Sequence, residues 1–208
     1  MDATKEAMNP ALKRIHKAAL HLFAEKGVSQ VNVSELAHAA GVARGTIYNN
    51  LNSTVDLFEE IADQLEIEML QRTAKSFDEI DDPALRLANG MRYFIRRTHE
   101  EPEWGRFFVR FAFTSQSLRN LWSRQPAEDL LRAMESGRYS FRRDQLPTVL
   151  AMIAGSVQAA MMLVLEGQKT WRDAGSDTAE LILRALGIDA SEAHALSTTE
   201  LPPLPMVD

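Results

Sequence analysis

The sequence contains no cysteine. Disulfide bonds, thiolate zinc sites and cysteine nucleophiles are therefore excluded, although the absence of cysteine does not by itself identify a cellular compartment. The first ten residues, MDATKEAMNP, lack the apolar core of a secretory signal peptide. We therefore expect a cytoplasmic protein.

The chain also lacks the common catalytic motifs. It has no G-x-S-x-G sequence, no phosphate-binding glycine loop and no H-E-x-x-H, and its five histidines do not fall at metal-ligand spacing with carboxylates. The acidic run from Asp78 to Asp82 lacks the glycine and the spacing of a calcium loop, so we interpret it as a solvated connection. We expect no enzyme activity, no cofactor and no metal site.

Positive charge is scarce and unevenly distributed. The 208 residues include 23 Lys and Arg against 29 Asp and Glu, which gives a net charge of -6. Residues 1–51 nevertheless hold six basic and four acidic residues, a balance of +2, so residues 52–208 carry -8. The N-terminal quarter is therefore the region suited to contact a polyanion.

The N-terminal quarter predicts three helices. Apolar residues recur at helical spacing over residues 10–26, 32–40 and 44–51. The first segment follows Asn9 with proline at its first position, and the second opens with Asn-x-x-Glu, a variant of the capping box. A three-residue turn containing Gly41 separates the second from the third, an arrangement typical of a helix-turn-helix.

The third helix carries a polar surface. Its inner face is Ile47 and Leu51, and its outer face holds Thr46, Tyr48, Asn49 and Asn50, with Arg44 near its start. Such side chains supply hydrogen-bond donors and acceptors for base edges and phosphates. The alternative is that they are only the solvated face of a small helix.

Residues 12–57 resemble the DNA-binding domain of the tetracycline repressor (TetR) family. The matching segments are A-x-x-L-F-A-E-K-G at 19–27, V-x-x-L-A at 33–37, A-G-V at 40–42 and G-T-I-Y at 45–48. The resemblance implies that the third helix enters the DNA major groove. The expected DNA-binding residues are Lys13, Asn32, Ser34, Ala43, Arg44, Gly45, Thr46, Tyr48, Asn49, Asn50 and Thr54.

Three positions depart from the family pattern. Thr54 stands where a phosphate-anchoring lysine is usual, Leu51 where an aromatic residue is usual, and Ala43 where serine often caps the helix. Because one cationic contact is missing, we expect weaker phosphate binding and a salt slope lowered by about one unit. Lys13, Arg14 and Lys17 of the first helix can share the attraction for phosphate.

The remainder of the chain also reads as helical. We predict an all-α protein of nine or ten helices, with a DNA-binding domain at 1–53, a ligand-binding and dimerisation domain at 54–188 and a flexible tail at 189–208. The tail contains LPPLP, whose P-x-x-P spacing alternatively suits a polyproline ligand. The helices expected after the first three cover residues 54–76, 83–98, 102–113, 126–136, 144–167 and 177–186.

Aromatic and methionine side chains concentrate in the middle helices. Each of them can simply fill a core, but as a group they suit an adaptable apolar cavity. The family resemblance implies a small-molecule pocket among these helices. The expected pocket residues are Leu65, Met69, Met91, Phe94, Ile95, Trp104, Phe107, Phe108, Phe111, Trp122, Met134 and Met152.

Four arginines lie on the same middle segment: Arg96, Arg97, Arg106 and Arg110. We expect them to be solvated or paired with the neighbouring glutamates. The alternative is that one faces inward and selects an acidic ligand.

Residues 145–165 contain no charge and are long enough to span a bilayer. A helix that is apolar all round can equally be buried between its own domain and a partner, which we favour over the membrane alternative because of Pro147 and Gln158. In the resembled family, the two C-terminal helices pair with those of a second copy. The expected homodimer interface comprises Ala151, Gly155, Gln158, Ala159, Met162, Leu181, Ile182 and Ala185.

Together these features predict a ligand-responsive transcriptional regulator. The expected partners are a palindromic double-stranded DNA operator, a small, largely apolar or aromatic effector and a second copy of the chain, with no membrane. We expect a repressor released by its effector, although the residues also allow the opposite polarity. The alternative function is an all-α small-molecule binding protein with little or no specific DNA binding, because Thr54 and the weak positive charge both disfavour DNA contact.

Overall fold

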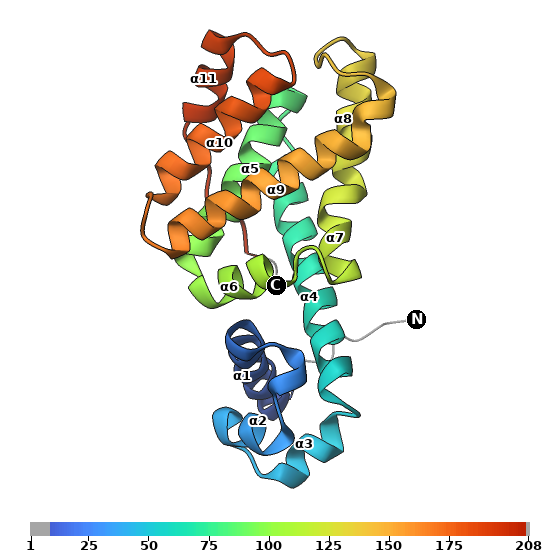
Figure 1. Ribbon diagram of the computed structural model, residues 1–208, viewed down its shortest axis with the longest axis vertical. Helices are drawn as coiled ribbons and strands as arrows, with labels where there is room; N and C mark the ends of the chain where they lie inside the picture. Colours follow the sequence, from blue (N-terminus) through green and yellow to red (C-terminus); the bar gives the residue numbers. More distant parts are fainter. Residues whose placement is uncertain (1–8, 207–208) are drawn as a thin grey trace. The chain divides into compact units, whose positions relative to one another are not determined.

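The computed structural model describes residues 9–206. Within these residues there are eleven α-helices, two short 3-10 helices and no strand, which confirms the predicted all-α class (Figure 1). The helices are α1 Pro10–Lys26, α2 Val33–Ala40, α3 Arg44–Asn50, α4 Thr54–Ser76, α5 Pro83–Glu100, α6 Pro102–Phe111, α7 Gln116–Ser123, α8 Gln125–Glu135, α9 Leu146–Leu165, α10 Trp171–Ala185 and α11 Ala190–Thr198.

The chain forms two compact units, and the first ends at Gln64 while the second begins at Leu65. The boundary expected after residue 53 therefore lies about three helical turns further along, inside α4. The reason is that Leu57, Phe58 and Ile61 of α4 are buried. We call residues 9–64 the N-terminal unit and residues 65–206 the C-terminal unit.

The N-terminal unit is built from α1, α2, α3 and the start of α4. Asn9 caps α1 by accepting the Ala11 N–H at 3.0 Å, as its sequence predicts. Between α2 and α3, Gly41 adopts a φ of 62°, in the left-handed region where glycine is favoured. Phe23 of α1 meets Phe58 of α4 edge to face, with 6.0 Å between ring centroids.

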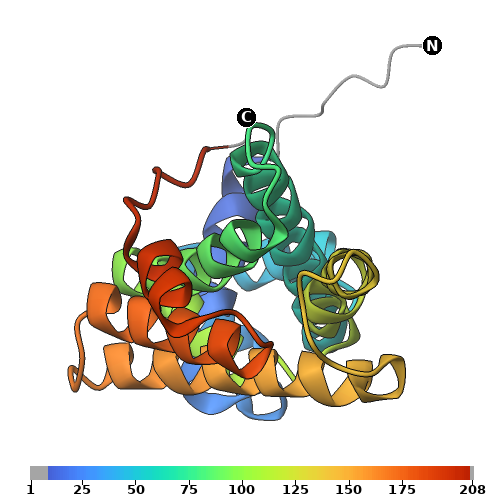
Figure 2. The same ribbon diagram turned by 90° about the horizontal axis from the view of Figure 1, so that it is seen from above.

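In the C-terminal unit, α5 is the central helix. It packs against α6, α9, α10 and α11 and is buried along most of its length (Figures 1 and 2). Asp82 caps α5 by accepting the Ala84 N–H at 3.0 Å, and also accepts two hydrogen bonds from Arg138 at 2.9 and 3.0 Å. A single carboxylate thus fixes both the start of α5 and the segment that follows α8.

Three helices differ from the sequence prediction. The short α7 was not predicted, and α10 begins at Trp171 with Thr170 as its cap, six residues before the expected start at Asp177. The third difference is α11, which occupies residues 190–198 of the segment expected to be a flexible tail.

The prediction of a loose segment at residues 190–198 is therefore wrong. Asp189 caps α11 by accepting the Ser191 N–H at 2.8 Å, and Glu192 accepts a hydrogen bond from Arg138 at 2.8 Å. Only two α11 residues are buried, so the helix has a weak apolar pattern, and it is held by packing on α10 and α5 together with these polar contacts.

Candidate functional site

The outward face of α3 carries most of the residues expected to bind DNA. Ile47 is 2% exposed and fixes the helix in the core, whereas Tyr48 is 69% exposed. Arg44, Asn49 and Asn50 of α3, the helix labelled in Figure 1, are also exposed. The seven-residue helix thus presents a row of hydrogen-bonding side chains, because its one buried residue fixes which face points outward.

Three members of this surface differ from the others. The side-chain amide of Asn50 donates to the Thr46 carbonyl at 2.7 Å, so part of its hydrogen-bonding capacity is used within α3. Ala43 provides no side-chain cap for α3. Gly45 is exposed and has open space where a Cβ would stand.

The remaining expected DNA-binding residues lie on α1, α2 and α4. Lys13 is exposed on α1, and Asn32 caps α2 by accepting the Glu35 N–H at 3.0 Å. Glu35 does not complete a capping box, since its carboxylate pairs with Lys26. Ser34 and Thr54 are half-buried.

The start of α4 is held by Ser53 rather than Thr54. The Ser53 hydroxyl accepts the Asp56 N–H at 3.0 Å, which leaves the Thr54 side chain without a capping role in these contacts.

A cavity of about 510 Å³ lies within the C-terminal unit, between α4, α5, α7, α8 and α9. This size falls in the range of small-molecule sites. Its wall is mostly apolar, with aromatic, aliphatic and a few charged residues. The lining residues are Leu70, Thr73, Ala74, Phe77, Asp78, Pro83, Arg86, Leu87, Gly90, Met91, Phe94, Leu121, Trp122, Gln125, Pro126, Asp129, Leu130, Tyr139 and Ile153.

Three of the twelve expected pocket residues, Met91, Phe94 and Trp122, line this cavity. The Phe94 and Trp122 rings are in contact, with 4.7 Å between centroids and a 35° angle between their planes. The other nine are not part of its wall, so their place in an effector site stays a prediction. These are Leu65, Met69, Ile95, Trp104, Phe107, Phe108, Phe111, Met134 and Met152.

The physical reason is that most of these nine side chains serve packing. Trp104 and Phe108 stack on one another, with 5.0 Å between centroids, and both are buried in the contact between α5 and α6. Helical spacing identifies an apolar face but not whether another helix or a cavity covers it. Phe77, Leu87 and Leu121 do line the cavity but were not expected. Their spacing is the same as that of apolar residues that pack against another helix.

The cavity wall includes polar groups without a full set of partners. The Arg86 guanidinium lies 3.7 Å from the Asp129 carboxylate and 5.1 Å from the centre of the Phe77 ring. Both Arg86 Nε and Trp122 Nε1 are buried without a hydrogen-bond partner. Tyr139 differs, because its hydroxyl donates to the Pro83 carbonyl at 3.0 Å and burial raises its pKa far above the usual value.

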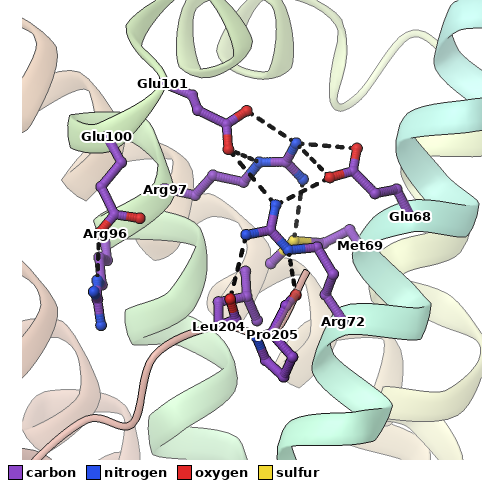
Figure 3. Close-up of polar contacts among 9 residues, drawn as sticks. All are labelled: Glu68, Met69, Arg72, Arg96, Arg97, Glu100, Glu101, Leu204 and Pro205. Carbon is purple, nitrogen blue, oxygen red and sulfur yellow. Dashed lines mark hydrogen bonds and ion pairs between the residues drawn. The ribbon is translucent and has the colours of Figure 1, made fainter. Parts of the chain in front are cut away.

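Beside α4, the arginines of α5 are paired as expected from the sequence. Arg97 is 3% exposed and bonds both Glu68, at 3.0 Å, and Glu101, at 3.1 Å (Figure 3). Arg96 donates to Glu100 at 2.7 Å. Arg97 does face inward, but its two carboxylates and the Trp104 ring, 4.5 Å away, already occupy it.

The expected dimer residues lie on one side of α9 and on α10. Ala151, Ala159 and Met162 are exposed on α9, and Gly155 and Gln158 are half-buried. Leu181 of α10 is 62% exposed, an unusual position for a leucine, and Ala185 is also exposed.

Ile182 is the exception among the expected interface residues. It is 4% exposed and belongs to the core of its own chain, which corrects its assignment to the interface. Gln158 also has a role within the chain, since its amide donates to the Val109 carbonyl at 2.5 Å.

The segment Arg143–Leu165 is the one stretch among residues 9–206 that is long and apolar enough to cross a membrane. Only a third of that window is buried within the chain. This membrane indication rests on length and composition alone, and an apolar helix at the interface between two copies of a protein would meet the same criteria. In residues 9–206 no group of three or more His, Asp or Glu side chains could hold a metal ion.

Two family models match the sequence. The model described as bacterial regulatory proteins of the tetR family matches residues 15–61, and the model described as the tetracyclin repressor-like C-terminal domain matches residues 82–198. The two matches cover the helices that carry the polar surface and those that enclose most of the cavity.

Curated relatives match over part of their length. The chain is 43% identical over 58 residues to the HTH-type transcriptional regulator AcrR of Shigella flexneri, which is 28% of this chain and 27% of AcrR. It is 34% identical over 80 residues to TtgR of Pseudomonas putida, which is 38% of each chain. The chain therefore spans about a quarter to two fifths of these regulators.

Solved structures match over nearly the whole chain. RolR in complex with resorcinol is 26% identical, with a TM-score of 0.71 over 94% of this chain and 96% of RolR. FadR of Bacillus subtilis in complex with stearoyl-CoA is 20% identical, with a TM-score of 0.71 over 86% of this chain and 100% of FadR. The FadR likeness shows the fold alone.

Proposed function

The chain belongs to the tetracycline repressor family, whose C-terminal model alone covers more than half of its residues, and from this we propose that it is a ligand-responsive transcriptional repressor. The observation that carries the proposal is the pairing of two features in one chain. The N-terminal unit exposes polar residues on a short helix, and the C-terminal unit encloses a separate cavity of about 510 Å³. The curated relatives are transcriptional regulators, which supports a cytoplasmic, DNA-binding role.

In this proposal α3 is the recognition helix. Arg44 and Tyr48 contact phosphates or base edges, and Asn49 offers an amide to adenine. Lys13 on α1 adds charge, while Thr54 and Ala43 contribute little. Binding then depends more on hydrogen bonds than on ion pairs.

The active form is a homodimer that pairs through the exposed sides of α9 and α10. Leu181, Met162 and Ala159 are the apolar residues that dimerisation would remove from water. Two copies related by a two-fold axis present two α3 helices to successive major grooves, about 34 to 36 Å apart, so the operator is palindromic.

We further propose that the effector is a small aromatic molecule bearing a hydroxyl group. The apolar wall and the aromatic residues Phe94 and Trp122 suit a ring. A hydroxyl group both donates and accepts, so it can accept from Arg86 or Trp122 and donate to Asp129. The binding of resorcinol by RolR supports this class of ligand.

A carboxylate effector fits less well. Two acidic side chains, Asp78 and Asp129, line the cavity against the single cation Arg86. A neutral hydroxyl avoids repulsion by these carboxylates and still satisfies the unpaired donors.

Effector binding acts on DNA through α4, the helix that belongs to both units. Leu70 and Thr73 of α4 line the cavity, so a ligand there contacts this helix directly. The ligand changes DNA affinity only by its differential affinity for the two states, a coupling of typically about 1 to 3 kcal/mol.

The test is selection of DNA from a random library, followed by release of the bound DNA by a panel of aromatic compounds. We expect an inverted repeat, and release by resorcinol or larger hydroxylated aromatics but not by toluene. Arg44→Ala and Tyr48→Ala should each weaken binding to the selected DNA by about 1 to 3 kcal/mol. Arg106→Ala, which removes an exposed charge from α6, should leave that binding unchanged.

If the protein retains no DNA sequence above the salt-screened nonspecific background, the proposal of a transcriptional regulator is refuted. Binding of the aromatic panel without any DNA selection would support the alternative of a small-molecule binding protein.

A further inference from the structure

The last residues of the described chain lie on the C-terminal unit in an extended form. Residues 199–206 follow α11 and contain the LPPLP motif. They form no helix or strand, yet Leu204 is buried, and Leu204 and Pro205 lie beside α4 and α5 (Figure 3). We call residues 199–206 the C-terminal strap.

Arginine side chains hold the C-terminal strap by its backbone. Arg72 of α4 donates from Nε to the Pro205 carbonyl at 2.9 Å and from Nη2 to the Leu204 carbonyl at 3.5 Å (Figure 3). Two arginines of α5 add further hydrogen bonds. Arg92 donates to the Thr199 carbonyl at 2.8 Å, and Arg96 to the Pro202 carbonyl at 3.4 Å.

Contacts outside the strap already hold the Arg72 guanidinium in place. It is 4% exposed and donates to Glu68 at 3.0 Å, and it lies 3.6 Å from Glu101. Arg97 shares the same two carboxylates, so two cations face two anions (Figure 3). This network orients the remaining Arg72 donors toward the strap carbonyls.

The sequence of the strap suits such a surface. Its three prolines favour an extended chain whose carbonyls are not used internally, and they reduce the entropy lost on docking. Leu204 provides one apolar anchor, while Pro202, Pro203 and Met206 remain exposed. One anchor and a few carbonyl contacts make a docking that can be reversed without unfolding the unit.

We propose that Arg72, Arg92 and Arg96 form a docking surface for an extended, proline-containing peptide, and that the C-terminal strap of this chain occupies it and braces α4 against α5. The strap contacts both helices at once, and α4 continues into the N-terminal unit. Bracing therefore restricts the helix through which an effector would act. The docking and the bracing do not depend on DNA, and only their effect on DNA rests on the proposed function.

The test uses the full chain with Leu204→Asp, which places a charge at the buried anchor, and with Met206→Asp as the matched control at an exposed strap position. A fluorescent peptide of residues 199–208 is titrated onto each protein by anisotropy. In the wild type the tethered strap competes at a high effective concentration. We expect the peptide to bind Leu204→Asp at least about tenfold more tightly than wild type or Met206→Asp.

Hydrogen exchange then measures bracing. Amides of residues 65–76 should exchange about tenfold faster in Leu204→Asp, while those of α9 stay unchanged, and excess peptide should restore the slow exchange. An additional Arg72→Met should abolish peptide binding, whereas an additional Arg106→Met should not. Thermal unfolding confirms that each variant is folded.

Two results would overturn the proposal: no peptide binding to Leu204→Asp, or equal exchange of residues 65–76 in all variants. With a selected DNA, we expect Leu204→Asp to weaken binding by about fivefold, and the peptide to restore it. If the wild type binds no specific DNA, the proposed function fails, while the peptide and exchange measurements still decide the docking.

Discussion

The two units of this protein carry their candidate functional residues on opposite sides of their helices. In the N-terminal unit, Ile47 is buried and Tyr48 points to solvent, so the surface proposed to read DNA is the outside of α3. In the C-terminal unit, Phe94 and Trp122 point inward, and the proposed effector site is a cavity. An outward site follows from a helix's own periodicity, but an inward site depends on how several helices pack.

A related contrast concerns charge. The exposed residues proposed to meet DNA include few cations, whereas Arg72 and Arg97 of the C-terminal unit are buried and each bonds a carboxylate. The carboxylates are partly exposed, but removing one of them would leave the charge of a buried arginine uncompensated. Arg72 and Arg97 thus hold α4 and α5 together through Glu68 and are not available to a polyanion.

The largest expected effect tests whether the N-terminal unit binds DNA tightly only when two copies of the chain form a dimer. Gly155→Arg places a long cation on the exposed side of α9, where a Cβ would meet nothing within 4 Å in its own chain. We expect a folded monomer, with half the mass by light scattering and affinity for the selected DNA lowered on the order of 100-fold by loss of the second recognition helix. Gln168→Arg, at an exposed position beyond α9, is the matched control. An unchanged mass would contradict the proposed interface.

An intermediate effect tests the polar contacts that fix the C-terminal unit. Asp82→Ala removes both the cap of α5 and the partner of Arg138, and should lower the free energy of unfolding by about 1 to 2 kcal/mol at pH 7. Asp82→Asn keeps a capping oxygen and loses only the charge, so it should cost about 0.5 to 1 kcal/mol. Chemical denaturation measures both values.

The pH dependence of that effect has a definite sign. Burial opposes ionisation of Asp82, but hydrogen bonds from Arg138 and from the Ala84 amide outweigh it and lower its pKa below the usual value. A lowered pKa stabilises the fold above the unfolded pKa of about 3.9, and the contribution is lost as the pH falls through the folded value. The difference in free energy of unfolding between wild type and Asp82→Asn should therefore be constant from pH 7 to 5 and disappear below about pH 4. A gap that persists in acid would show that Asp82 does not act through its charge.

The smallest expected effect tests the cavity chemistry. Trp122→Phe removes the unpaired Nε1 donor and keeps an aromatic ring, so resorcinol affinity measured by calorimetry should fall by about two- to tenfold. Toluene, which accepts no hydrogen bond, should bind both proteins alike. Trp171→Phe, outside the cavity wall, is the matched control. Equal losses for resorcinol and toluene would mean that Trp122 acts by shape alone.

The sequence predicted the helices that have strong local signals. Asn9-Pro10, the Gly41 turn and Asp82-Pro83 marked helix ends that the structure confirms. The start of α10 was missed because Asp177 followed by Glu180 imitates a cap, while Thr170 is the residue that accepts the Asp173 N–H. α11 was missed because its apolar pattern is weak and it is held by packing on α10 and α5 and by Arg138, 54 residues earlier in the chain.

By itself, the sequence determined the all-α class, the family and the outward residues of α3, because these depend on spacing within one or two helices. Only the tertiary structure decided which apolar residues surround the cavity and which pack against other helices. It alone showed that Ile182 belongs to the core and that the LPPLP segment is docked on arginines of α4 and α5. The reason is that an apolar or proline-rich segment indicates that it will be buried or docked, whereas the residues that contact it lie on helices distant in the sequence.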